Sequence, residues 1–156
     1  MITFNIPGDR QYTIENVVCD FNGTLAVDGT LLPGVEGAIR RLVESVTVHV
    51  VTADTFGSAR RELEGLPVDV TILPRETQDE AKAELVDRLG ADRVLAIGNG
   101  RNDLLMLRAA AIGICVLQRE GAYRETMQAA DVVCASPVDA LELLLNPKRL
   151  VATLRR

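Results

Sequence analysis

The sequence is poor in aromatic residues and has no tryptophan. Phe and Tyr make up 3% of its 156 residues, which argues against a surface that stacks nucleic-acid bases. There are 17 Lys and Arg residues against 22 Asp and Glu, for a net charge of −5, and the one basic block is a short run at the end. Because nucleic-acid affinity rests on clustered basic residues, no nucleic-acid partner is expected.

Several kinds of catalytic centre are also missing. The only histidine, His49, lies within an apolar run and is interpreted as structural, which excludes a Ser-His triad and a histidine metal cluster. There is no G-x-x-x-x-G-K-[ST] motif, so a P-loop nucleotide-hydrolysing enzyme is not expected.

Signals for disulfides and membrane insertion are absent as well. Cys19, Cys115 and Cys134 form no C-x-x-C pair, and each lies in or beside an apolar run, which predicts free core cysteines in a reducing compartment. No apolar run approaches the roughly 20 residues of a membrane span, and the opening MITFNIPGDR does not resemble a signal peptide. We therefore expect a cytoplasmic protein without a membrane partner.

Short β-branched runs alternate with segments of helical periodicity, which predicts an α/β fold: a mainly parallel sheet with helices on both faces. The predicted strands are residues 16–19, 46–51, 68–73, 94–97, 112–116 and 131–134. The predicted helices begin at 35, at a capping box over 77–80, and at 104, 120, 138 and 149.

Residues 1–156 are expected to form one domain. A hairpin within about residues 1–15, turning at Pro7-Gly8-Asp9-Arg10, is expected at one edge of the sheet. The core is expected to span about residues 16–145, and Pro147 breaks the chain at the start of a tail of about residues 146–156.

Four polar side chains stand at or beside successive strand ends, where parallel α/β sheets bind ligands. They are Asp20, Thr52, Lys82 and Asp103. A carboxylate placed like Asp20 can act as a nucleophile, and Asp103 follows an Asn-rich loop whose oxygens suit Mg²⁺. Thr52 could donate to a phosphate oxygen, and Lys82 could balance its charge. Together these groups predict phosphoryl transfer.

Each residue also has a purely structural interpretation. Asp20 could be a turn former and Thr52 a helix cap. Lys82 could be a solvated helix residue paired with Asp79 or Glu80, and Asp103 could be a helix-starting residue after a tight turn. The occurrence of all four residues, in order, at successive strand ends favours the functional interpretation.

Four segments resemble the signature motifs of the haloacid dehalogenase (HAD) superfamily, and most closely those of the P-type ATPase phosphorylation domain. They are Asp20-Phe21-Asn22-Gly23-Thr24-Leu25, Thr52-Ala53-Asp54, Lys82, and Gly98-Asn99-Gly100-Arg101-Asn102-Asp103. The resemblance covers about residues 16–145 and implies a three-layer Rossmann-like sandwich. About a dozen residues separate Thr24 from the first predicted helix, so no cap domain is expected. The open site then implies a large substrate or a lid from a neighbouring subunit, hence a possible homo-oligomer.

The resemblance also implies roles for individual residues. Asp20 would form a phospho-aspartate, with Asn22, Thr52 and Lys82 as the other catalytic positions. The phosphoryl group would be bound by Gly23, Thr24, Thr52, Ala53, Lys82 and Asn102, and Mg²⁺ by Asp20, Asn22, Asn99 and Asp103, with a short flap over 26–32. The expected substrate is a small phosphorylated molecule or a phosphoprotein.

Two positions depart from the family pattern. Asn22 stands where family phosphatases have the general acid and base, and its loss typically costs about 10²–10⁴-fold in rate. Asn99 replaces the first acid of the metal loop, which predicts weak Mg²⁺ binding. We therefore expect a slow Mg²⁺-dependent phosphohydrolase or phosphotransferase. The alternative is a catalytically degenerate binding or regulatory protein that keeps the anion site.

Overall fold

The central sheet is parallel throughout its described pairings. In the computed structural model, which describes residues 1–54 and 57–156, its strand order is β10-β9-β8-β3-β6-β7. The strands are β3 (Asn16–Asp20), β6 (Thr47–Thr52), β7 (Asp69–Ile72), β8 (Val94–Gly98), β9 (Ile112–Val116) and β10 (Val132–Cys134). The order reverses between β3 and β8, so the carboxyl ends of these two strands flank the switch point at which such sheets bind ligands.

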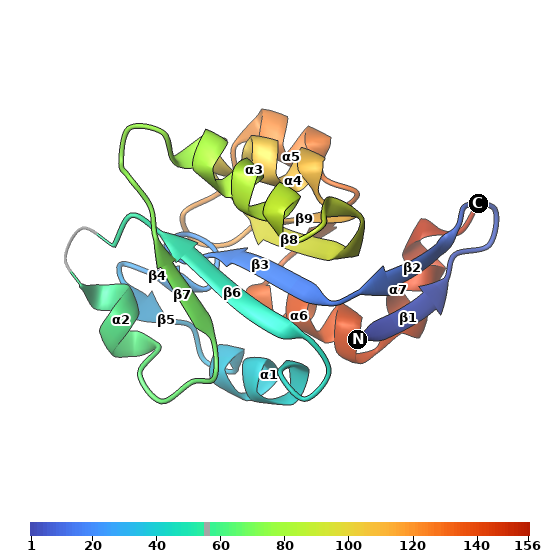
Figure 1. Ribbon diagram of the computed structural model, residues 1–156, viewed down its shortest axis with the longest axis horizontal. Coiled ribbons are helices and arrows are strands. Elements are labelled where there is room, and N and C mark those ends of the chain that lie inside the picture. Colours follow the sequence, from blue (N-terminus) through green and yellow to red (C-terminus); the bar gives the residue numbers. More distant parts are fainter. Residues whose placement is uncertain (55–56) are drawn as a thin grey trace.

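Helices cover both faces of this sheet (Figure 1). They are α1 (Val35–Leu42), α2 (Ser58–Glu62), α3 (Gln78–Arg88), α4 (Leu104–Ala109), α5 (Arg124–Ala129), α6 (Pro137–Leu145) and α7 (Pro147–Leu154), with single 3₁₀ turns η1 (Ala91–Arg93) and η2 (Arg101–Asp103). Helices α3, α4 and α5 lie on one side of the sheet, and α1 and α6 lie on the other. The predicted α/β architecture is confirmed.

Neighbouring residues of β3 enter two separate cores because side chains alternate across a strand. Val17 and Cys19 belong to the cluster that includes residues of α1 and α6. Val18 belongs to the other cluster, with Val86 of α3. Both faces of the strand are therefore buried, which explains why its sequence is apolar without alternation.

The N-terminal hairpin was predicted at an edge of the central sheet, and this placement is wrong. Strands β1 (Ile2–Asn5) and β2 (Gln11–Ile14) form their own antiparallel sheet, and β2 leads through Glu15 directly into β3. Phe4 and Ile14 are buried in the same cluster as Leu150 of α7. The hairpin therefore packs on α7 instead of extending the sheet.

Two connections approach the carboxyl ends of the strands. Strands β4 (Ala26–Val27) and β5 (Thr30–Leu31) make a short antiparallel hairpin between β3 and α1, which corresponds to the predicted flap. Helix α2, which the sequence did not predict, stands between β6 and β7. Within the described ranges neither connection carries a cap domain.

Some local predictions need correction. Helix α5 begins at Arg124, because residues 117–123 form a loop with Gly121 in the left-handed region (φ 75°). Thr77 precedes α3 as predicted, but its side chain makes no capping hydrogen bond. The buried face of α3 carries Lys82 beside Leu85 and Val86, while Ala81 is half-buried.

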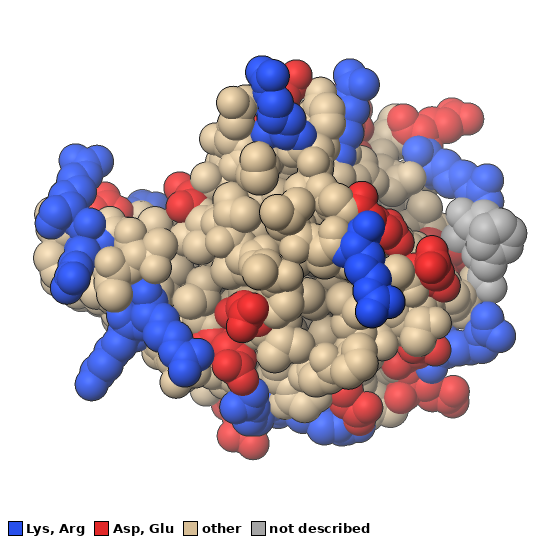
Figure 2. Space-filling model, turned by 180° about the vertical axis from the view of Figure 1, so that it is seen from behind, with Lys and Arg blue, Asp and Glu red and all other residues tan. Residues whose placement is uncertain are grey.

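The three cysteines are free and buried, as predicted. No helix in the described part of the chain is long and apolar enough to cross a membrane. The face in Figure 2 carries acidic and basic side chains intermixed, with Lys and Arg prominent at the end formed by the hairpin and α7. This mixture agrees with the low net charge and differs from a continuous basic surface.

Two glycines provide a matched test of the packing. A Cβ on Gly113 in β9 would lie 2.6 Å from the Leu107 carbonyl oxygen, whereas one on Gly37 in α1 would meet nothing within 4 Å. We expect Gly113→Ala to destabilise the fold by about 1–3 kcal/mol through overpacking. Gly37→Ala should stabilise it by about 1 kcal/mol, because Ala is the better helix former. Urea unfolding of both variants measures these changes, and equal effects would contradict the packing described.

Candidate active site

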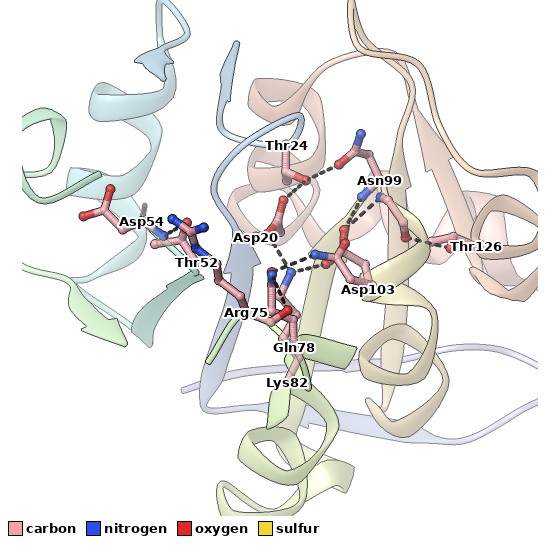
Figure 3. A network of polar contacts seen from close by, with 12 residues as sticks. Asp20, Thr24, Thr52, Asp54, Arg75, Gln78, Lys82, Asn99, Asp103 and Thr126 are labelled. Carbon is pink, nitrogen blue, oxygen red and sulfur yellow. Dashed lines mark hydrogen bonds and ion pairs between the residues drawn. The ribbon is translucent and has the colours of Figure 1, made fainter. Parts of the chain in front are cut away.

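A buried lysine joins two buried carboxylates at the carboxyl ends of β3 and β8 (Figure 3). The Lys82 Nζ atom lies 2.7 Å from Asp20 Oδ1 and 2.7 Å from Asp103 Oδ1. Lys82 and Asp103 are fully buried, and Asp20 is 6% exposed. The lone ammonium leaves this cluster with a net charge of −1, so burial is only partly compensated.

Backbone geometry brings these three groups together. Asp20 is the last residue of β3, and Asp103 ends the η2 turn that follows β8. Lys82 projects from the N-terminal half of α3, which packs across this end of the sheet. The alternative in which Lys82 pairs with Asp79 or Glu80 at the surface is therefore excluded by its burial and its two partners.

Asp103 also shapes the loop after β8. Its Oδ2 atom accepts hydrogen bonds from the backbone amides of Asn99 and Gly100, both at 2.9 Å. A Cβ on Gly98 would lie 2.5 Å from the Asp103 side chain, so only glycine fits there. Both oxygens of Asp103 are thus engaged, one by Lys82 and one by the loop.

Thr24 links the loops after β3 and β8. Its buried hydroxyl lies 3.3 Å from Asp20 Oδ2 and 3.2 Å from Asn99 Oδ1. Because the hydroxyl has a single proton, it donates to only one of these oxygens at a time. The other oxygen is then left without this hydrogen bond.

The side chain of Asn99 is fixed at both ends. Its Nδ2 atom donates to the Gly121 carbonyl at 3.0 Å, while Oδ1 accepts from Thr24. Thr126, which is fully buried, donates to the Gly100 carbonyl at 2.8 Å and supports the same loop. Nothing in the sequence around Gly121 or Thr126 distinguished these two residues as supports.

A cleft of about 530 Å³ opens in front of this cluster. Its walls include five of the predicted site residues: Asp20, Asn22, Thr52, Ala53 and Asn102. Flap residues Asp28 and Gly29, together with Asp54, Ser58 and Gln78, complete the lining. The volume is within the usual range of small-molecule sites.

The remaining predicted residues lie behind the cleft wall. These are Gly23, Thr24, Lys82, Asn99 and Asp103, all of them buried. Gly23 has φ 78°, and a Cβ there would lie within 3 Å of the side chains of Asn99 and Glu120. Close packing therefore requires glycine at this position.

Thr52 and Gln78 present polar groups at the cleft. Thr52 Oγ1 accepts a hydrogen bond from the Asp54 amide at 3.1 Å, and within residues 1–54 and 57–156 its own proton has no acceptor. Gln78 Oε1 accepts from Asn102 Nδ2 at 3.0 Å, which joins α3 to the loop after β8. The sequence suggested Gln78 only as part of a capping box and missed its place in the cleft.

The buried charges perturb one another. Burial and the Asp103 carboxylate raise the pKa of Asp20 to about 7, because Lys82 and Thr24 offset only part of this cost. Burial alone would lower the pKa of Lys82, but Asp20 and Asp103 keep it above its ordinary value. Lys82 therefore keeps its proton at neutral pH.

The available donors suit a hard cation with few charged ligands. Asp20 Oδ2 and Asn99 Oδ1 converge on the Thr24 hydroxyl, and the exposed Asn22 side chain lines the cleft beside them. All are oxygen donors of the kind that Mg²⁺ prefers. Among residues 1–54 and 57–156, no group of three His, Cys, Asp or Glu side chains forms a ready metal cage. The oxygen donors present are therefore of the type that suits a hard cation such as Mg²⁺.

No protein-family model matches the chain. It is 44% identical to the uncharacterized protein MJ0073 of Methanocaldococcus jannaschii over 79 residues, which cover 48% of this chain and 85% of that protein.

Solved structures share the fold at low sequence identity. The 3-deoxy-D-manno-octulosonate 8-phosphate phosphatase of Moraxella catarrhalis, in complex with magnesium, phosphate and KDO, is 18% identical with a TM-score of 0.71, covering 91% of this chain and 94% of that one. The cobalt-bound phosphatase YrbI of Haemophilus influenzae is 17% identical with a TM-score of 0.73, covering 92% and 94%. A putative HAD superfamily subfamily III A hydrolase of Legionella pneumophila is 17% identical, also at 0.73, covering 90% and 87%. These likenesses confirm the predicted fold.

The raised pKa of Asp20 predicts how stability depends on pH. The folded chain holds the Asp20 proton up to a pKa of about 7, against an ordinary value of 3.8. Stability from this proton is present at low pH and is lost as pH rises through about 7. Thermal unfolding should therefore give a melting temperature that falls from about pH 4 to 7 and then levels off, and Asp20→Asn should flatten this trend. Equal slopes for the two proteins would contradict it.

Proposed function

We propose that this chain is a phosphohydrolase that forms a phospho-aspartate on Asp20. The chain belongs to the same family as the Methanocaldococcus jannaschii protein MJ0073. It has the fold of the HAD superfamily. The observation that carries the proposal is the buried Asp20–Lys82–Asp103 cluster, which opens through Asp20 into the cleft. A reactive carboxylate, a fixed cation and a pocket for the substrate then stand together.

In the first half-reaction an Asp20 carboxylate oxygen attacks the phosphorus atom, and the bond to the leaving group breaks. Lys82 holds Asp20 in place through its 2.7 Å contact and offsets the charge that gathers as phosphate approaches. Thr52 has a free hydroxyl proton at the cleft wall, which suits donation to a phosphoryl oxygen. In the second half-reaction water attacks phosphorus and releases Asp20.

The remaining predicted site residues would help to hold the metal ion and to shape the phosphate pocket. Asp20, Asn22 and Asn99 would hold Mg²⁺, and Asp103 would fix the metal loop behind them through its bonds to Lys82 and the loop amides. Bound there, the ion would neutralise charge on the phosphoryl oxygens. The loop of Gly23 and Thr24, together with Ala53 and Asn102, would shape the phosphate pocket.

The open cleft suits a small phosphorylated molecule or a phosphoprotein, since the flap is the sole cover seen within the described ranges. We further propose a single domain over residues 1–156, a cytoplasmic location that suits three free cysteines, and a homo-oligomer whose neighbour covers the site.

A second candidate function is phosphate-dependent binding without turnover. Two features of the loop after β8 favour it. Asp103 is already bonded to Lys82 and to the backbone amides of Asn99 and Gly100, and position 99 carries a neutral side chain. Such a protein would keep the anion site and act as a regulatory module.

Hydrolysis of 4-nitrophenyl phosphate with added Mg²⁺ separates the two candidates. We expect slow turnover in the wild type that Asp20→Asn abolishes. Asn22→Asp should raise the rate by about 10-fold, because it adds a carboxylate at the base of the flap that can take a proton from the attacking water. Phosphate binding without Asp20-dependent turnover in the wild type or in Asn22→Asp would favour the regulatory function instead.

A further inference from the structure

We propose that Asp28, at the tip of the flap, is the general acid and base of the reaction and performs the proton transfer that Asn22 cannot. The inference rests on the proposed phosphohydrolase function. A leaving alkoxide needs a proton and the attacking water must lose one, so a site without a proton-transfer group turns over slowly.

Asp28 is the free carboxylate of the cleft. Three carboxylates line it: Asp20, Asp28 and Asp54. Asp20 is bonded to Lys82 and lies near the Thr24 hydroxyl. Asp54 Oδ1 accepts from the Ala59 amide at 2.9 Å, and its carboxylate points away from Asp20 in Figure 3. The side chain of Asp28 has no hydrogen-bond partner among residues 1–54 and 57–156 and is exposed on the cleft wall.

The flap holds Asp28 in a defined place. Asp28 has φ 50° and Gly29 has φ 77°, so both residues of the turn are left-handed, as a tight two-residue hairpin requires. Asp is among the few residues that tolerate this region, because its short side chain can bond locally. The side chain is nevertheless left without such a bond, which keeps it available to a ligand.

Neighbouring elements anchor the flap on two sides. On one side Glu120, in the loop after β9, accepts a hydrogen bond from the Asp28 amide at 3.3 Å. On the other side Glu62 of α2 accepts from the Leu31 amide at 2.8 Å, and Gly29 lies close against Ser58. The backbone of Asp28 is thus held by neighbouring elements, while its carboxylate has no hydrogen-bond partner in the part of the chain that the structure describes.

Asn22 lies at the base of the same flap. A β-bridge joins Asn22 to Ala26, the first residue of β4, so the flap grows directly from the loop that carries Asp20. Asn22 and Asp28 both line the cleft. The carboxylate of Asp28 at the tip of the flap therefore lines the same pocket as the Asn22 amide at its base.

Asp28 alone can carry both proton transfers of the reaction, first to the leaving oxygen and then from the attacking water. As Asp20 attacks phosphorus and the ester P–O bond breaks, the protonated Asp28 carboxyl gives its proton to the departing oxygen and the alcohol is released. Water then attacks the acyl phosphate and passes a proton to the Asp28 carboxylate, while the bond between phosphorus and Asp20 breaks. Inorganic phosphate leaves, and Asp28 is again protonated.

Leaving-group dependence tests this role. The kcat/KM value reports the steps up to release of the first product, in which an alkoxide needs a proton and 4-nitrophenolate does not. Asp28→Asn should lower kcat/KM about 10²-fold for an alkyl phosphate such as propyl phosphate, and by less than about 3-fold for 4-nitrophenyl phosphate. It should also lower kcat for the aryl ester, because breakdown of the phospho-enzyme needs the base.

Rescue completes the test. Asn22→Asp in the Asp28→Asn background should restore most of the lost alkyl activity, because an acid then stands at the base of the flap. The control is Asp87→Asn on α3, which removes an exposed carboxylate outside the cleft and should leave both esters unchanged. Circular dichroism and thermal unfolding of Asp28→Asn check that the variant folds.

Other outcomes overturn the inference. Equal losses for the two esters would mean that Asp28 only positions the flap, and no loss would mean that it has no part in the reaction. Both results leave the proposed function intact as long as turnover still depends on Asp20. Absence of Asp20-dependent turnover would instead contradict the proposed function itself.

Discussion

The contact of one ammonium with two carboxylates organises the whole site. Lys82 meets Asp20 and Asp103 at 2.7 Å each, with the three side chains almost fully removed from water. Two carboxylates buried side by side would repel each other strongly, and an unpaired buried charge costs several kcal/mol. Lys82 therefore fixes how α3 lies against the ends of β3 and β8. Burial and the neighbouring Asp103 carboxylate together raise the pKa of Asp20.

Around this contact the polar groups form a connected network. Asp103 is bonded to Lys82 through one oxygen and to the amides of Asn99 and Gly100 through the other. Thr126 donates to the Gly100 carbonyl. The Thr24 hydroxyl lies between Asp20 and Asn99. No buried side-chain nitrogen or oxygen in the described residues lacks a partner. Fully satisfied networks of this kind hold a site rigid before its ligand arrives. In the proposed reaction such rigidity would help, because the protein would not have to reorganise as charge develops.

The two asparagines fit this charge balance. A carboxylate at position 99 would add a second uncompensated negative charge beside Asp20 and Asp103, and it could not donate to the Gly121 carbonyl as the amide does. The amide thus avoids further repulsion within the cluster, and it would attract a cation less strongly than a carboxylate would. At the base of the flap Asn22 carries an amide, whereas at its tip Asp28 carries a carboxylate that has no hydrogen-bond partner within the described residues.

The sequence by itself determined the alternation of strands and helices and the four polar positions at the strand ends. Both follow from local chemistry, because burial on two faces makes strands apolar and turns collect Asp, Asn, Gly and Thr. Tertiary structure alone decided three further features: the burial of Lys82, the packing of the N-terminal hairpin on α7, and the places of Gln78, Glu120 and Thr126 around the loops. These features depend on contacts between segments far apart in the chain. No local periodicity records such contacts, since a lysine or glutamate in a helix or loop looks the same whether it meets solvent or a partner from another strand.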